Sequence, residues 1–203
     1  HDEVVHGKGS LWGKVPGDPW RKAATLRAYF AYMWAHPGKQ LLFMGAELGN
    51  PAEWSEAGEL PWQLGDDPLH AGIRSAVGDL NRIYRASPAL YSQDFTPSGF
   101  TWIDANDREG NVFAFLRWGD DGSVLACLVN FSAVPHTGYR VGLPRPGGWR
   151  EVLNTDAISY GGSGVGNLGR VLADGESMHG QPASAQLTLP PLGAVWLVPD
   201  DTD

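Results

Sequence analysis

The spacing of hydrophobic residues changes about halfway along the chain. In the first part, apolar residues recur every three or four positions over 19–34 and 68–84, which predicts two helices. In the second part, short runs of alternating apolar and polar residues lie between turn-forming residues, which predicts β-strands. We therefore expect two domains, residues 1–95 and residues 96–203.

Each predicted helix begins at an Asp-Pro pair, Asp18-Pro19 and Asp67-Pro68. The aspartate can cap the helix, and proline fits the first helical position, where its missing N–H is not needed. The runs His36-Pro37-Gly38 and Ser87-Pro88 end the two helices. The expected buried faces consist of Ala23, Leu26, Phe30, Met33 and Trp34, and of His70, Ile73, Val77, Leu80 and Tyr84. We interpret His70 as a half-buried member of its face and not as a metal ligand.

A strand of a covered parallel sheet is predicted over 40–45, because this short run is apolar on both faces. The preceding helix and the polar pair His1-Asp2 complete the order of a crossover unit whose first strand would precede His1. In parallel α/β sheets, reactive groups lie at the carboxyl ends of strands. We therefore expect Asp2 and Glu47 on one rim of the sheet.

The second part predicts an antiparallel β-sandwich. Its predicted strands are 100–103, 111–118, 123–131, 139–143, 149–154, 186–189 and 194–198. Residues 107–110 and 119–122 are predicted hairpin connections. The glycine-rich run 161–167 is a flexible loop, and it is not expected to bind phosphate because no helix follows it.

Composition excludes several classes of partner. The formal net charge of -8 argues against nucleic acids and anionic membranes, and no apolar run approaches the roughly 18 residues of a membrane span. The single cysteine, Cys127, lies in an apolar run and is expected to be buried. Because the chain cannot form an internal disulfide, a cytoplasmic location is favoured.

The opening run, residues 1–9, gathers charged and imidazole groups in one turn-forming segment. It begins without methionine, and we expect an upstream part of the polypeptide. Three interpretations remain open: a surface turn, a metal site formed by His1, Asp2 and His6, and glycoside chemistry. In glycoside chemistry a carboxylate such as Asp2 stabilises a cationic transition state, and a histidine such as His1 holds sugar hydroxyls.

The run His1-Asp2-Glu3-Val4-Val5-His6-Gly7-Lys8 resembles the last catalytic motif of the α-amylase superfamily, in the form found in glycogen branching enzymes. Further matches in the family's order are 37–45, Glu53-Trp54, 149–156 and 189–191. The resemblance implies a chain of mixed α/β and all-β class. It implies the last two βα units of a (β/α)₈ barrel followed by a C-terminal antiparallel β-sandwich, with the rest of the barrel and any N-terminal modules absent.

By this resemblance Asp2 is the transition-state stabiliser and His1 binds the substrate sugar. The implied enzyme needs no cofactor or metal; it cuts an α-1,4-glucan, retains the anomeric configuration and re-attaches the chain by an α-1,6 link. The family's nucleophile and acid/base have no counterpart here, which implies that these residues alone are inactive. Alternatives are a non-catalytic glucan-binding or structural module, and an α-glucan hydrolase of the same superfamily.

The long loop after Glu47 carries two tryptophans, Trp54 and Trp62. Glu47, Trp54 and Trp62 are candidates for binding the glucan, the tryptophans by stacking on sugar faces. The alternative is that both tryptophans pack the loop onto the barrel. Two positions depart from the family's usual pattern, Pro61 before Trp62 and Asn50 in place of glutamine.

Overall fold

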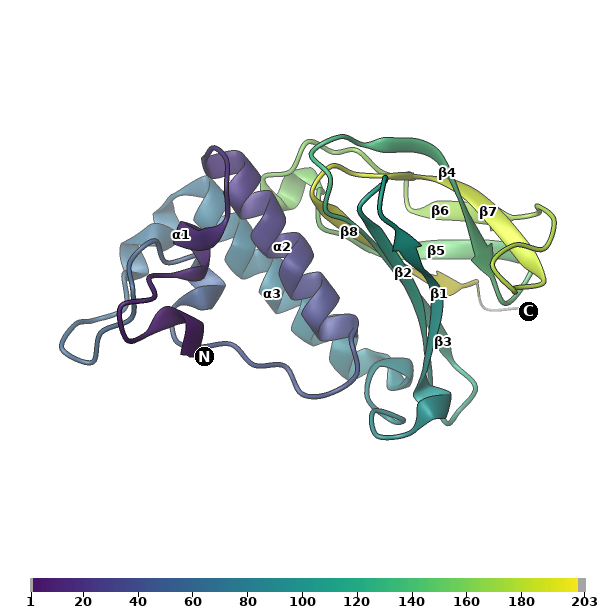
Figure 1. Cartoon of the computed structure of the whole chain (residues 1–203), viewed down its shortest axis with the longest axis horizontal. Coiled ribbons are helices and arrows are strands. Elements are labelled where there is room, and N and C mark those ends of the chain that lie inside the picture. Colours follow the sequence, from purple (N-terminus) through teal and green to yellow (C-terminus); the bar gives the residue numbers. More distant parts are fainter. Residues whose placement is uncertain (1, 201–203) are drawn as a thin grey trace.

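Helices, a large sheet and a small sheet form three successive layers (Figure 1). The computed structural model describes residues 2–200, with only the backbone of Asp2. The helices are α1 (Leu11–Lys14), α2 (Pro19–Ala35) and α3 (Pro68–Ala86). Short 3₁₀ turns are η1 (Asp2–Val4), η2 (Ala46–Leu48), η3 (Trp62–Asp66), η4 (Pro88–Leu90), η5 (Pro97–Gly99) and η6 (Ile158–Tyr160).

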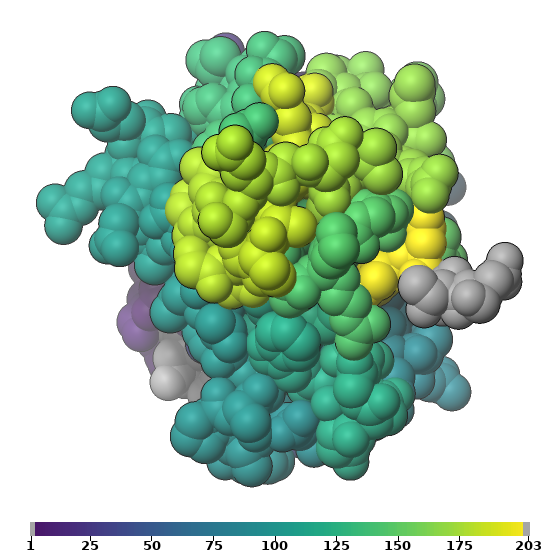
Figure 2. Space-filling view, turned by 90° about the vertical axis from the view of Figure 1, so that its right-hand side faces the viewer, coloured from purple at the N-terminus to yellow at the C-terminus, as the bar shows by residue number. Residues whose placement is uncertain are grey.

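All strand pairings among the described residues are antiparallel. The strands are β1 (Phe100–Asp107), β2 (Val112–Trp118), β3 (Val124–Asn130), β4 (His136–Leu143), β5 (Gly147–Asn154), β6 (Arg170–Ala173), β7 (Ala183–Leu189) and β8 (Gly193–Pro199). The large sheet has the order β1-β2-β3-β8-β5-β6, and β4 pairs with β7 in the small one. Figure 2 shows the face of the molecule that the sandwich and its loops dominate.

The two predicted helices are confirmed, including their first residues. The carboxylate of Asp18 accepts a hydrogen bond from Arg21 N at 2.9 Å, and Asp67 accepts one from Leu69 N at 2.8 Å. Each proline occupies the start of its helix. Within the described part of the chain, no helix combines the length and apolar character needed to cross a membrane.

The predicted buried strand over 40–45 is wrong for this chain. The segment has no regular structure, and Figure 1 shows it as an extended run from the end of α2 toward the opening turn. Leu41 and Met44 are 58% and 51% exposed. A strand that is apolar on both faces needs a neighbour for its backbone hydrogen bonds, and every described pairing lies in the sandwich. Among the described residues, no parallel strand pairing is therefore formed around Asp2 and Glu47.

The predicted antiparallel sandwich is confirmed, and β3 shows how it is built. Leu125, Cys127 and Val129 belong to the apolar cluster shared with α2 and α3. The alternate residues Val124, Ala126 and Leu128 belong to the cluster between the two sheets. All seven residues of β3 are buried, which explains its unbroken apolar run. Burial also confirms the interpretation of Cys127 and raises the pKa of its thiol.

One strand, β6, is not predicted from the sequence. It has four residues, follows the glycine-rich loop and pairs with the first half of β5. Its alternating burial is too short to distinguish from a turn by periodicity. The division of the chain at residue 95 stays a prediction, although α2, α3 and the large sheet share one apolar cluster.

A loop of the sandwich, residues 155–165, joins the sheet to the helices. Its backbone accepts a hydrogen bond from Arg27 Nε at Thr155 O, 2.8 Å, and one from Trp20 Nε1 at Gly161 O, 3.0 Å. Burial lowers the pKa of Arg27 to about 10, against the opposing effect of the charge on Asp156. These bonds fix α2 against a loop more than a hundred residues away.

Asp156 forms hydrogen bonds within the loop 155–165, and Tyr160 attaches the loop to α3. Asp156 accepts hydrogen bonds from Ser163 N at 2.8 Å, Ser163 Oγ at 2.6 Å and Val165 N at 3.1 Å. Tyr160 donates its hydroxyl proton to Asp79 of α3 at 2.5 Å. The resemblance over 149–156 therefore falls on a segment that attaches the sandwich to the helices.

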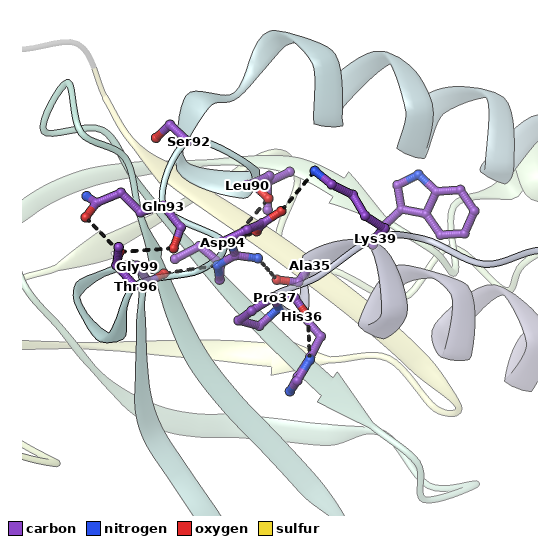
Figure 3. Close-up of polar contacts among 12 residues, drawn as sticks. Ala35, His36, Pro37, Lys39, Leu90, Ser92, Gln93, Asp94, Thr96 and Gly99 are labelled. Carbon is purple, nitrogen blue, oxygen red and sulfur yellow. Dashed lines mark hydrogen bonds and ion pairs between the residues drawn. The ribbon is translucent and has the colours of Figure 1, made fainter.

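A buried arginine, Arg117, connects the ends of several segments. Figure 3 labels its partners Ala35, Leu90, Asp94 and Gly99. Arg117 of β2 donates to the carboxylate of Asp94 at 2.6 Å and to the carbonyls of Ala35, Leu90 and Gly99 at 2.6, 3.2 and 3.1 Å. The side chains of Arg117 and Asp94 are fully buried, and Lys39 lies 3.6 Å from the second carboxylate oxygen. Removing one member would leave a buried charge uncompensated.

Two glycines of α3 provide a matched test of the helix–loop contact. A Cβ at Gly72 would lie 2.1 Å from Tyr160 O, whereas one at Gly78 would meet no atom within 4 Å. We expect Gly72→Ala to destabilise the chain by ~1–3 kcal/mol through overpacking, and Gly78→Ala to stabilise it by ~0.5–1 kcal/mol through helix propensity. Urea unfolding of both variants measures this, and equal effects would contradict the contact.

The Tyr160–Asp79 bond predicts a pH-dependent contribution to stability. Hydrogen bonding by Tyr160, then by Arg82, holds the pKa of Asp79 below its usual value, so its contribution is complete above about pH 4 and disappears as the pH falls through the lowered pKa. We expect Tyr160→Phe to reduce the unfolding free energy by ~1 kcal/mol at pH 7, with the difference shrinking in acid.

Urea unfolding between about pH 7 and pH 2 measures this difference. The matched control is Tyr29→Phe, since Tyr29 is 42% exposed on α2 and its hydroxyl makes none of these bonds. A difference between wild type and Tyr160→Phe that stays constant down to pH 2 would show that Asp79 is not the group involved.

Candidate functional site

The opening turn, whose first residue is the predicted catalytic residue Asp2, lies on the side of the molecule away from the sandwich (Figure 1). Asp2 begins the 3₁₀ turn η1; its side chain and all of His1 lie outside the described residues. The next residue, Glu3, accepts a 2.5 Å hydrogen bond from Lys14 Nζ, which also binds the Glu3 carbonyl at 2.5 Å. The hydrogen bond and charge of Lys14, with the charge of Lys8, lower the pKa of Glu3.

The segment after the irregular run 40–45 lies against this turn. Trp54 N donates to Val4 O at 3.1 Å, and Ser10 Oγ donates to Pro51 O at 2.9 Å. Val4 and Ala46 line the same small cavity. Glu47 follows Ala46 in η2 and is half-buried. The chain therefore brings the two predicted rim segments together without a parallel sheet between them.

A carboxylate closes the loop that follows the opening turn. Glu53 accepts hydrogen bonds from Gly7 N at 2.9 Å and from Gly9 N at 2.7 Å. These two bonds, more than the nearby charges of His6 and Lys14, lower the pKa of Glu53. Two backbone amides directed at one anion form a nest. The match of Glu53-Trp54 to the family assigns no role to Glu53, and the signal for this contact in the sequence is the pair of spaced glycines, Gly7 and Gly9.

The two candidate sugar-binding tryptophans occupy different environments. Trp54 is half-buried, and its ring meets that of Phe43 at 5.2 Å in an edge-to-face arrangement. Trp62 is 62% exposed at the start of η3. Trp54 therefore packs the loop, whereas Trp62 leaves a ring face accessible to solvent. Their roles in glucan binding stay predictions.

The structure confirms His70 as a member of the buried face of α3. Its Nδ1 lies 2.7 Å from Leu48 O, and its ring stacks on Trp12 at 4.6 Å. Among the residues that the structure describes, no three His, Cys, Asp or Glu side chains are grouped to hold a metal ion. The metal interpretation of the opening run includes His1 and the Asp2 side chain, so it stays untested.

A separate groove lies between the end of α3 and the sandwich. Its volume is about 740 Å³, and its lining includes Arg82, Arg145, Arg150, Glu151 and Asp200. None of the predicted site residues contributes to it. The groove is therefore not the site that the opening motif forms.

Part of the chain matches a known protein family, and its fold is similar to that of solved structures. A family model described as "Alpha amylase, C-terminal all-beta domain" matches residues 102–200. The structure resembles Ttha1563 from Thermus thermophilus, with a TM-score of 0.60 and 21% identity over 88% of this chain and 31% of that one. It also resembles the maltogenic amylase from S. marinus, with a TM-score of 0.51 and 16% identity over 86% and 19% of the two chains. At these identities the two structures support the fold alone.

Curated relatives are much closer in sequence. The 1,4-alpha-glucan branching enzyme GlgB of Frankia casuarinae is 62% identical over 202 residues, which are 98% of this chain and 25% of the relative. The proteins of the same name from Rhodococcus jostii and Mycobacterium tuberculosis are each 60% identical, over 97% and 98% of this chain and 28% and 27% of theirs.

These matches place the chain in the α-amylase superfamily. Within it, the chain belongs to the family of the glycogen branching enzymes, as the motifs indicated. It spans about a quarter of the length of the curated relatives that it matches.

The contrast between the two tryptophans predicts different effects on stability. Because Trp54 packs on Phe43, we expect Trp54→Ala to reduce the unfolding free energy by ~1–3 kcal/mol. Because Trp62 is mostly exposed, Trp62→Ala should change it by less than ~0.5 kcal/mol. Urea unfolding of the 203-residue chain compares them. Equal losses would mean that Trp62 also packs the loop.

Proposed function

We propose that the complete protein is a glucan branching transferase of glycogen biosynthesis, acting on an α-1,4-glucan. The observation that supports this most directly is the carboxylate motif beginning at Asp2, held in an ordered turn against the 43–54 segment, in a chain with branching enzymes as relatives. The two remaining carboxylates that the resemblance implies have no counterpart among these 203 residues, so these residues alone are proposed to be inactive.

The proposed chemistry requires a negative group beside a developing positive charge. Cleavage of an α-1,4 link passes through an oxocarbenium-like transition state, and a retaining enzyme holds the glycosyl group on a second carboxylate. Asp2 stabilises the transition state and His1 binds hydroxyls of the same sugar. The 6-hydroxyl of an acceptor glucan then attacks the glycosyl-enzyme, which forms the α-1,6 link. Glu47 and the exposed ring of Trp62 are the candidates for gripping glucan near this point.

The proposed context of the first part is a (β/α)₈ barrel. In it, α2 and α3 are the helices of the last two βα units, and residues 40–45 become a strand once neighbouring strands supply hydrogen-bond partners. The capped helices and the both-face apolar character of 40–45 support this context. The sandwich from residue 96 onward then forms the following domain.

Product analysis on amylose tests the proposed function. We expect the complete protein to create α-1,6 branch points, detected by debranching and chain-length analysis, with little new reducing sugar. Release of reducing ends in proportion to the bonds cut would instead identify a hydrolase of the superfamily. Binding of amylose without either product would leave only a glucan-binding module.

Replacing Asp2 tests its proposed catalytic role. In the complete protein we expect Asp2→Asn to lower turnover by at least ~10²-fold, because a preorganised charge opposite the transition state is lost. Circular dichroism and the melting temperature should be those of wild type. A loss below tenfold in folded protein would remove Asp2 from the mechanism.

A further inference from the structure

We propose that Glu53 is a positioning residue for the catalytic turn: its carboxylate occupies the amide nest of Gly7 and Gly9 and fixes the backbone that carries Asp2. The inference rests on the proposed function for its kinetic part, and on the described contacts for its structural part. Glu53 lies 46 and 44 residues from the two amides that it binds, so the contact joins two separate segments.

The loop after the opening turn needs an external partner. His6, Gly7 and Gly9 have φ values of 62°, 79° and 79°, in the left-handed region that residues with a side chain rarely adopt. A Cβ at Gly7 or Gly9 would meet no atom within 4 Å, so backbone conformation and not space requires these glycines. Within the loop itself, the described backbone bond is a long one, from Lys8 N to Val5 O at 3.4 Å.

The nest is suited to a carboxylate. Each oxygen of Glu53 accepts one amide hydrogen, Oε1 from Gly7 and Oε2 from Gly9. A glutamine offers a single acceptor oxygen, and its amide group would face an N–H donor. The two hydrogen bonds also hold the pKa of Glu53 below its usual value, which keeps the charged form present at neutral and mildly acidic pH.

Together with two other contacts, the hydrogen bonds of Glu53 hold the backbone that follows Asp2. Lys14 holds Glu3 from one side, and the amide of Trp54, the neighbour of Glu53, holds Val4. The nest holds the chain immediately beyond, at Gly7 and Gly9. Loss of the nest partner frees that end of the turn, and a shift of about 1 Å in a catalytic group can lower the rate ~10²-fold.

The structural part is tested on the 203-residue chain by NMR. We expect the amide shifts of Gly7 and Gly9 to titrate together in acid, with a midpoint below that of an ordinary glutamate. Glu53→Gln should abolish this titration, whereas the matched control Glu56→Gln, three residues further along the same loop, should leave it intact. Amides that do not titrate, or that titrate unchanged in Glu53→Gln, would overturn the assignment.

The kinetic part is tested on the complete protein with amylose. We expect kcat to fall ~10-fold in Glu53→Gln and ~10²-fold in Glu53→Ala, with KM within about threefold and Glu56→Gln within about twofold of wild type. The graded loss separates a positioning role from general destabilisation, and melting temperatures of the two Glu53 variants are compared directly. A kcat in Glu53→Ala within twofold of wild type, or a rise in KM alone, would refute positioning.

The NMR test and the kinetic test give independent answers. If wild-type protein forms no branch points, the proposed function is wrong, and the amide titration still decides whether Glu53 holds the loop. If the titration behaves as expected and branching is present, but kcat is insensitive to Glu53, the nest is structural only and the positioning role is rejected.

Discussion

The large sheet must be covered on both faces, and the rest of the structure follows from this constraint. One of its two middle strands, β3, is buried throughout, with alternate residues in the two apolar clusters. The small sheet β4–β7 covers one face, and helices α2 and α3 cover the other. An uncovered face with residues such as Phe115 and Trp196 would expose a large apolar patch, which soluble proteins avoid.

Polar contacts set the angle at which helices and sandwich meet. Apolar packing is not directional, whereas the guanidinium of Arg117 must satisfy three carbonyls and one carboxylate at once. Near the middle of the helices, residues 155–165 bind α2 through Arg27 and α3 through Tyr160. The sandwich is thus a fixed support for the helices, and the loops at their N-terminal ends carry the candidate site.

The elements that sequence analysis predicted correctly are those whose patterns are local. Helices α2 and α3 are capped by their own Asp-Pro pairs, and the strands of the sandwich are separated by their own turns. The failure at 40–45 has the opposite cause: a strand exists only when another strand pairs with it. Its composition is that of a buried strand, but among the described residues it belongs to neither sheet. Composition alone could not reveal this.

In the candidate site too, some features follow from the sequence and others only from the tertiary structure. By itself, the sequence determined the residue types of the opening motif, the family to which they belong and the glycines that permit left-handed backbone at 7 and 9. Only the tertiary structure decided that Glu53 binds those glycines, that Trp54 is packed while Trp62 is exposed, and that Arg117 and Asp94 form a buried pair. The physical reason is that residue type and backbone freedom are properties of neighbouring positions. A hydrogen bond between residues more than forty positions apart forms only when the fold of the intervening chain brings those residues together.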